Sequence, residues 1–245
     1  MALKAPAVSA DEDKCPFSSV IDRLVARNEM QTDELTETIG SLLMAGVDTT
    51  AYVMGWLWIN LARSVEAQGQ LAAELESVLA GSDVKEEDLD RLPYLRACVR
   101  ESHRLTPPFP QGHTRRLKND ITIGGYTFPA GMLLSMNINA FQMDKKYVDE
   151  PEEYRPERWL PEAVARRKGT EKEVLDHRLL EHPFGAGARM CLGSKLAEIE
   201  IIVATARIFQ DWKVTLDPPE QKWNKKQLLF VKADPFPKFK LTPRH

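Results

Sequence analysis

The chain has 245 residues, of which 43% are hydrophobic and 28% are charged, a composition that is ordinary for a folded domain of this length. Its net charge of −3 gives no sign of nucleic-acid binding, which depends on clustered Lys and Arg. Three cysteines without a Cys-x-x-Cys pair indicate neither a disulfide framework nor a zinc site, and no run reaches the roughly 20 apolar residues of a membrane span.

The N-terminal third is expected to be helical after a short lead-in. Residues 1–17 carry acids at positions 11–13 and no apolar run, so we expect a disordered segment that is neither a signal peptide nor a transit peptide. Thr32, followed by two acids, is typical of a helix start, and apolar residues then recur at mostly helical spacing. The pattern predicts helices over residues 32–62 and 65–80, the second closed by Gly81, and a short helical turn over 82–89.

The rest of the chain mixes helices with short strands. Pro107 and Pro108 end a helix predicted over residues 94–105, and Gly124-Gly125 is expected to join two strands. The expected order is then strands at 121–123, 126–128 and 132–137, an irregular stretch at 147–160, a flexible polar loop at 162–180, a helix at 194–210 and a terminal hairpin. These elements predict a mainly α fold with minor β, in one domain over residues 18–245.

Cys191 lies in a glycine-rich run directly before the last predicted helix. A thiolate needs positive potential, which free N–H groups at a helix start provide. Gly187 and Gly193 allow the close approach of a bulky planar group, Arg189 offers a fork of donors to a carboxylate, and Phe184 can shield the sulfur from water. The run therefore suits a single thiolate presented to the metal of a flat, anionic cofactor. The alternative is a glycine-rich turn around a buried, inert cysteine.

A second motif, Ala45-Gly46-Val47-Asp48-Thr49, lies in the middle of the long predicted helix. Glycine, aspartate and threonine have poor helix propensity, and a local rule broken in mid-helix often marks a functional site. The alternative is a solvent-exposed kink in which threonine bonds back to a preceding carbonyl.

A third motif pairs Glu101 with Arg104, which share one helix face. A surface ion pair worth roughly 0–1 kcal/mol is the default interpretation.

These motifs together resemble the cytochrome P-450 family of haem-thiolate monooxygenases. Phe184-x-x-Gly187-x-Arg189-x-Cys191-x-Gly193 matches the family's haem-binding loop at every fixed position, and three more motifs occur in the family's order. The similarity covers nearly all of this chain but only the C-terminal half of a usual member. It implies the C-terminal portion of that fold, without the half that supplies a membrane anchor or targeting signal and much of the substrate pocket. The three further motifs are residues 45–49, 101–104 and 156–159.

The resemblance also implies roles for single residues. Cys191 would be the proximal ligand of haem b (iron protoporphyrin IX), with Thr49 hydrogen-bonding oxygen on the distal side and Asp48 relaying protons. Glu101 would be buried between Arg104 and Arg158 in a structural unit. The other residues implied to contact haem are Phe184, Gly187, Arg189, Gly193, Ala45, Gly46 and Arg115.

Four arginines have an alternative interpretation as solvated surface residues. Arg115, by its distance from Gly124-Gly125, resembles the family's arginine that binds a haem propionate, with Arg116 as a possible substitute. Arg96 and Arg100 lie four positions apart on one helix face, where mitochondrial-type members dock an acidic ferredoxin.

The function implied is oxygen insertion into an apolar organic substrate, steroid-like or lipid-like by analogy only. Electrons would come from a ferredoxin-type partner or a flavin reductase, and no nucleic acid is expected to bind. Two alternatives stay open: a non-catalytic, truncated haem-binding fragment, and a haem-thiolate isomerase or peroxide-cleaving relative. Similarity to mitochondrial-type members at residues 105–107, 156–159 and 196–198 suggests a parent protein at the mitochondrial inner membrane.

Overall fold

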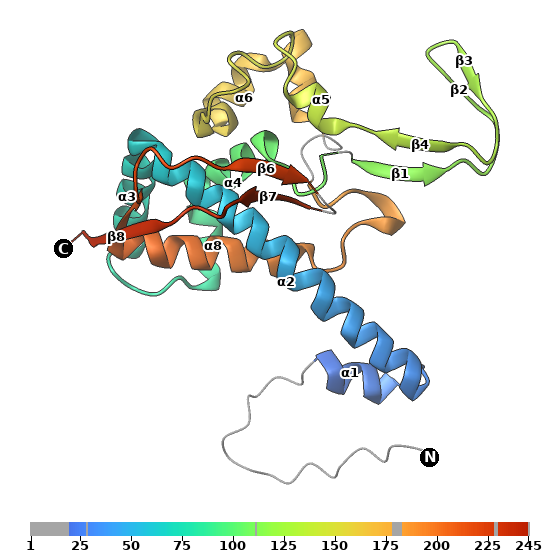
Figure 1. Ribbon diagram of the computed structural model, residues 1–245, viewed down its shortest axis with the longest axis horizontal. Coiled ribbons are helices and arrows are strands. Elements are labelled where there is room, and N and C mark those ends of the chain that lie inside the picture. The colour runs from blue at the N-terminus through green and yellow to red at the C-terminus, as the bar shows by residue number, and fades with distance from the viewer. Residues whose placement is uncertain (1–19, 28, 111, 178–182, 228–229, 245) are drawn as a thin grey trace. The chain divides into compact units, whose positions relative to one another are not determined.

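A computed structural model describes residues 20–27, 29–110, 112–177, 183–227 and 230–244 of the chain (Figure 1). The lead-in expected over residues 1–17 lies outside them. The chain divides into two compact units, residues 1–48 and 49–245. The boundary falls inside the helix α2 (Thr32–Arg63), so the two units are taken in turn.

The described part of the first unit is helical. It contains α1 (Val20–Arg27) and the beginning of α2. Asp33 and Glu34 occupy the first turn of α2, where acids favour the positive end of the helix dipole, and the Glu34 carboxylate accepts the Gln31 N–H at 2.9 Å. Of the described helices, α2 alone is long and apolar enough to cross a bilayer. From Thr50 onward its residues are largely buried, as in a core helix.

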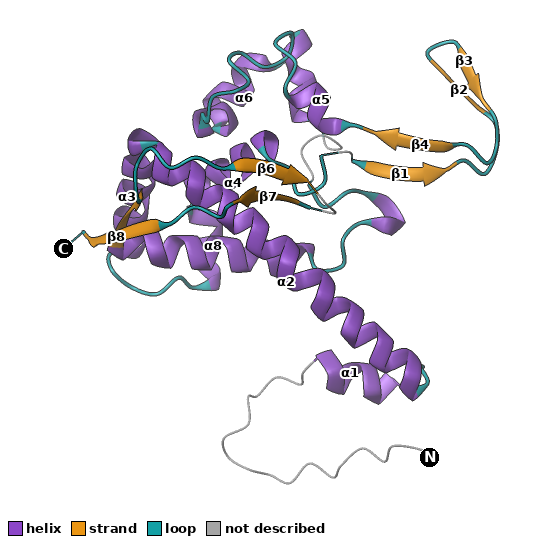
Figure 2. Cartoon of the chain, viewed as in Figure 1, coloured by secondary structure: helices purple, strands orange, loops and turns teal. Residues whose placement is uncertain are grey.

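The second unit is built on four helices that share one apolar core. The end of α2 packs with α3 (Val65–Leu79), α4 (Pro93–Leu105) and α8 (Ser194–Asp211), as Figure 2 shows in purple. The core contains fully buried leucines from α2, α3 and α4 and the ring of Phe209 from α8. Burial of such side chains is worth about 1.5–3 kcal/mol each, which explains why apolar residues on these helices recur at helical spacing.

The start of α4 is fixed from outside the helix. Pro93 lies in its first turn, where a missing N–H costs nothing. The next two N–H groups, of Tyr94 and Leu95, donate to the carboxylate of Glu74 on α3 at 2.7 and 2.9 Å. Burial raises the pKa of Glu74 while these backbone donors lower it. The contact joins α3 to α4 and sets the direction of the helix that carries Glu101.

Within its described residues, the second unit also contains four two-stranded antiparallel sheets. The strand β1 (His113–Arg116) pairs with β4 (Leu133–Met136), and β2 (Ile121–Ile123) pairs with β3 (Tyr126–Phe128) between them. The C-terminal strands are nested in the same way, with β6 (Asn224–Gln227) and β7 (Val231–Asp234) inside the pair β5 (Trp212–Leu216) and β8 (Phe239–Pro243). The sequence predicted β2, β3 and β4, but it missed β1 and gave one terminal hairpin in place of two nested pairs.

Short helices connect α4 to α8. Those described before residue 178 are α5 (Ile138–Gln142), η2 (Pro156–Trp159), α6 (Pro161–Arg167) and η3 (Glu171–Asp176). The turn η1 (Glu86–Arg91) precedes α4. The flexible loop predicted over residues 162–180 is therefore wrong for its described part. Arg167 binds Asp176 in a two-pronged ion pair at 2.6 and 3.0 Å, and Lys172 binds Asp149. Polar composition here reflects ion pairs that fold the segment.

Candidate functional site

The residues around Cys191 form a short closed loop before α8. The Cys191 N–H donates to the Phe184 carbonyl at 2.9 Å, and the turn η4 (Gly187–Arg189) lies between them. Gly187 has a φ of 72°, a left-handed conformation that costs a residue with a Cβ about 1–2 kcal/mol. Gly193 then caps α8. The loop places Cys191 within one turn of a helix N-terminus, with its side chain exposed and free of a disulfide.

The arginines expected near this loop differ in what they contact. Arg189 is exposed on η4. Arg115 is exposed on β1 and donates only to the neighbouring Thr114 carbonyl in the contacts described, at 3.0 Å. Arg116 donates to the Gly131 carbonyl at 2.8 Å. Arg116 therefore links β1 to the turn that precedes β4. Arg115 and Arg189 keep exposed guanidinium groups.

The mid-helix motif forms regular α-helix through all five residues. Ala45, Gly46 and Asp48 are exposed and belong to the first unit, whereas the half-buried Thr49 begins the second. The helix is unbroken at Gly46. A Cβ added to Gly46 would meet no heavy atom within 4 Å. The roles of Asp48 and Thr49 beside a haem stay predictions.

Glu101 is the centre of a buried hydrogen-bond network. It is 0% exposed, and Arg104 donates to both its oxygens, from Nε at 2.9 Å and from Nη2 at 2.8 Å. Arg158 on η2 donates from Nε at 3.2 Å. The structure thus brings together the three side chains that the sequence grouped, and the pair is buried rather than on the surface.

Two further donors to Glu101 were missed by sequence reasoning. The Trp159 indole donates to Oε2 at 2.8 Å, and the Arg155 backbone N–H donates to Oε1 at 3.0 Å. The sequence signal for the Trp159 donor was its position directly after Pro-Glu-Arg, because a buried indole N–H needs an acceptor. Glu101 therefore joins α4 to the whole of η2.

Arg104 extends the network to the connecting segment. Its guanidinium donates to the carbonyls of Pro151, Gln142 and Glu153 at 2.7, 3.1 and 3.1 Å. A buried cation is tolerated only when its donors are satisfied, and here carbonyls supply what the single carboxylate cannot. Burial lowers the pKa of Arg158, an effect that the adjacent Glu101 charge opposes.

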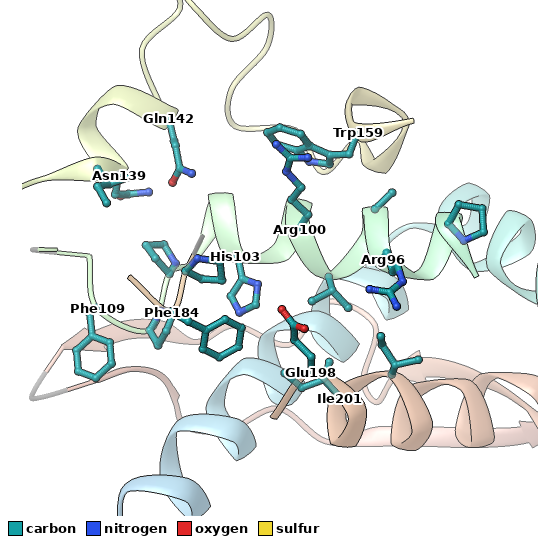
Figure 3. A pocket seen from close by; sticks show the side chains of 18 of the residues that line it. Arg96, Arg100, His103, Phe109, Asn139, Gln142, Trp159, Phe184, Glu198 and Ile201 are labelled. Atoms are coloured by element: carbon teal, nitrogen blue, oxygen red, sulfur yellow. The ribbon is translucent and has the colours of Figure 1, made fainter. Parts of the chain in front are cut away.

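Arg96 and Arg100 are unequally available. Arg96 keeps 44% of its side chain exposed beside Asp90, 3.1 Å away. Arg100 has 23% exposed, stacks on the Trp159 ring with its guanidinium carbon 3.9 Å from the centroid, and lies 3.7 Å from Asp176. Both line one cleft of about 430 Å³ between α4, α8 and residues 183–184 (Figure 3). Of the two, Arg96 presents the more exposed charge.

His103 is a cleft residue that sequence reasoning passed over. Its ring meets the Phe184 ring edge-on, with centroids 6.3 Å apart, and Figure 3 shows Glu198 of α8 reaching toward it from below. Burial lowers the pKa of His103 to about 4, so the imidazole is neutral near pH 7. His103, on α4, therefore packs against Phe184, the first residue of the Cys191 loop.

A family model described as Cytochrome P450 matches residues 10–241. The chain belongs to the cytochrome P450 family. It is 32% identical over 206 residues to a mouse (Mus musculus) protein named 1,25-dihydroxyvitamin D(3) 24-hydroxylase, mitochondrial, covering 84% of this chain and 38% of that protein. It is 33% identical over 216 residues to ferruginol synthase of Salvia pomifera, covering 87% of this chain and 46% of the synthase.

A solved cytochrome P450 has the same fold as this chain. The crystal structure of a cytochrome P450 (CYP102L1) superposes with a TM-score of 0.77 at 25% sequence identity, over 88% of this chain and 47% of that one. The prediction of a mainly α fold that forms part of a cytochrome P450 is confirmed. The chain spans less than half the length of each of these three proteins.

Cytochrome P450 membership implies a haem cofactor with a cysteine thiolate ligand, and the loop fits it chemically. Cys191 is exposed, and a Cβ added to Gly187 or Gly193 would meet no heavy atom within 4 Å. Met190 and Leu192 beside it expose apolar surface, 51% and 84% respectively. Among the described residues no cluster of His, Cys, Asp and Glu can hold a metal by itself. A lone thiolate with apolar neighbours suits a metal whose other ligands come from a macrocycle.

Proposed function

We propose that this chain supplies the cysteine-bearing part of a haem-thiolate monooxygenase acting on apolar organic molecules. The observation that carries the proposal is the exposed Cys191, presented at the start of α8 by a hydrogen-bonded loop. Family membership supports it, as do the words hydroxylase and synthase in the names of two relatives.

Each residue of the loop has a distinct task in this proposal. Cys191 provides the thiolate ligand, and the free N–H groups at the start of α8 stabilise its charge. Arg189 and Arg115 pair with the two propionates through exposed guanidinium groups. Phe184, held by His103, keeps water from the sulfur. Haem with a thiolate ligand supplies the electron density that favours cleavage of the O–O bond.

The α2 motif is assigned the protons of the reaction in this proposal. The Thr49 hydroxyl donates a hydrogen bond, and Asp48 exchanges protons with solvent, for which its exposed position is suited. Ala45 and Gly46 leave room for haem because neither carries a large side chain. The presence of both Asp48 and Thr49 favours oxygen activation over the isomerase and peroxide-cleaving alternatives.

The electron donor is proposed to be an acidic ferredoxin in mitochondria. A mouse relative has mitochondrial in its name, and Arg96 provides an exposed cation on α4. The Arg96→Glu variant of the complete protein should slow ferredoxin-driven reduction and steepen its salt dependence. Arg100→Glu is a poorer test because it breaks the stack on Trp159. Unchanged reduction by ferredoxin with Arg96→Glu would contradict docking at Arg96.

The chain by itself is proposed to bind haem weakly and without turnover. It covers 38–47% of three relatives and neighbours, and a haem held by one part of its usual shell leaves much apolar surface in water. This favours the haem-binding fragment as the second candidate for the isolated chain.

Haem titration followed by Soret absorbance tests both candidates. Cys191→Ala should abolish the thiolate-type spectrum, whereas Cys98→Ala, which removes the fully buried thiol, should retain it. Stoichiometric haem in the purified wild-type chain would contradict weak binding. A Cys191→Ala spectrum identical to the wild type would contradict the assignment of the ligand.

A further inference from the structure

Thr170 lies in an exposed turn between α6 and η3. Its hydroxyl donates to the Arg167 carbonyl at 2.7 Å and accepts the Lys172 backbone N–H at 3.2 Å. The preceding Gly169 has a φ of 76°, and a Cβ added to it would meet no heavy atom within 4 Å. The Thr170 hydroxyl is thus presented at the surface by its own turn, with open space beside it.

A run of basic residues directly precedes Thr170. Residues 166–168 place Arg, Arg and Lys four, three and two positions before the hydroxyl. Arg166 and Lys168 are exposed, whereas Arg167 keeps only 12% of its side chain exposed. Kinases select protein substrates partly by charge pattern, and cations shortly before a hydroxyl form one such pattern. Short motifs of this kind also occur by chance, so the surroundings of Thr170 decide.

Thr170 borders a cleft that is rich in cations. The cleft has a volume of about 630 Å³ and lies between residues 146–158 and residues 163–175. Among the described residues that line it, six are Lys or Arg and three are Asp or Glu. The six are Lys146, Arg155, Arg158, Arg166, Arg167 and Lys172. A phosphate on Thr170, with a charge of about −1.5 to −2, would therefore face an excess of positive charge.

Two of these cations are held only by exposed ion pairs. Lys172 binds Asp149 at 2.6 Å with 37% of its side chain exposed, and Lys146 lies 3.6 Å from Glu171 with 55% exposed. Exposed pairs of this kind contribute little to stability, so a phosphate dianion can compete with a single carboxylate for either lysine. Lys172 is also the residue whose backbone N–H already contacts the Thr170 hydroxyl.

We propose that Thr170 is a phosphorylation site for a serine/threonine kinase that selects basic residues, and that the cleft holds the phosphate. The Thr170 Oγ1 attacks the γ-phosphorus of ATP. The new O–P bond forms as the bond from the γ-phosphorus to the β,γ-bridging oxygen breaks, ADP leaves, and the hydroxyl proton passes to the kinase's catalytic base. The phosphate gives up the hydrogen bond to the Arg167 carbonyl and gains Lys172 and Arg166 as counter-ions. The site involves neither haem nor turnover.

Mass spectrometry after treatment with an arginine-directed serine/threonine kinase and Mg²⁺-ATP tests the target residue in the full 245-residue protein. We expect phosphate at position 170 in the wild type and in Thr170→Ser, and its loss in Thr170→Ala. Thr242→Ala is the matched control and should keep the phosphate, because Thr242 is also exposed and follows lysines at two and four positions, but lies in β8. No phosphate at Thr170, or equal incorporation in the wild type and Thr170→Ala, would overturn the proposal.

Removal of the phosphate by a phosphatase tests the role of the cleft. Lys172→Gln removes a cation that lines the cleft, whereas Lys168→Gln removes an exposed lysine that is not among the lining residues. We expect phosphorylated Lys172→Gln to lose its phosphate about two- to fivefold faster than the phosphorylated wild type, and Lys168→Gln to match the wild type. Equal rates for all three proteins would overturn the assignment of the cleft. Since haem is absent throughout, neither result bears on Cys191.

Discussion

The sharpest stability prediction concerns the replacement of Glu101 by glutamine. The substitution keeps the size of the side chain but removes its negative charge and turns one acceptor into an NH₂ donor. In the native protein both oxygens only accept, from donors on Arg104, Arg155, Arg158 and Trp159. The new amide group must therefore face another donor, and two arginines lose their counter-charge.

The expected loss follows from burial. The Glu101 and Arg104 side chains are both 0% exposed, and removing one partner of such a pair typically costs about 3–5 kcal/mol. Five hydrogen bonds of 2.8–3.2 Å converge on the carboxylate, so we place the loss at the upper end, about 4–5 kcal/mol. A domain is stable by only about 5–15 kcal/mol in total. Glu101→Gln should therefore lose between about a quarter and nearly all of the unfolding free energy.

Urea unfolding followed by tryptophan fluorescence measures this loss. Glu200→Gln, at an exposed position on α8, is the control and should change the unfolding free energy by less than about 0.5 kcal/mol. If Glu101→Gln does not fold, Trp159→Phe removes one donor and should cost about 1–3 kcal/mol. An unfolding midpoint for Glu101→Gln equal to that of the wild type would refute the reasoning.

Two further predictions concern α4 and the β1–β4 sheet. Burial lowers the pKa of His103 to about 4, so the unfolded state takes up a proton at a higher pH than the folded state does. The unfolding free energy should therefore fall as the pH is lowered from about 6.5 to 4. His103 contributes at most about 1.4 kcal/mol per pH unit to this slope. His103→Leu should remove that part of the slope; identical pH profiles would contradict it. Gly112→Ala should cost about 2–4 kcal/mol, because Gly112 has a φ of 67° and its added Cβ would lie 1.7 Å from the Met136 carbonyl oxygen. Gly124→Ala, also at positive φ but with no atom within 4 Å, should cost only about 1–2 kcal/mol in thermal unfolding, and equal losses would count against the steric argument.

Local patterns predicted the long helices well. α2, α3, α4 and α8 begin and end within about two residues of the expected positions, because caps, prolines and apolar spacing act locally. The link between Glu101 and Arg158 came from family resemblance. It joins residues far apart in the sequence, and no local pattern predicts it.

The rest depended on contacts that a sequence does not display. Residues 161–176 look like a solvated loop until Arg167 meets Asp176 and Lys172 meets Asp149. Strand β1 was missed because His113–Arg116 lacks apolar alternation and is defined by its pairing with β4. Arg100 looks as solvated as Arg96 in the sequence, and its stacking partner Trp159 comes from a different element. Tertiary partners of this kind override local composition.

The reduced carbon-monoxide difference spectrum of the chain, expressed with haem supplied, tests the central claim most directly. It reports the ligand that Cys191 is proposed to provide. The account predicts a thiolate-type Soret band in the wild type and in Cys98→Ala, and its loss in Cys191→Ala. A thiolate-type band that persists in Cys191→Ala would contradict it.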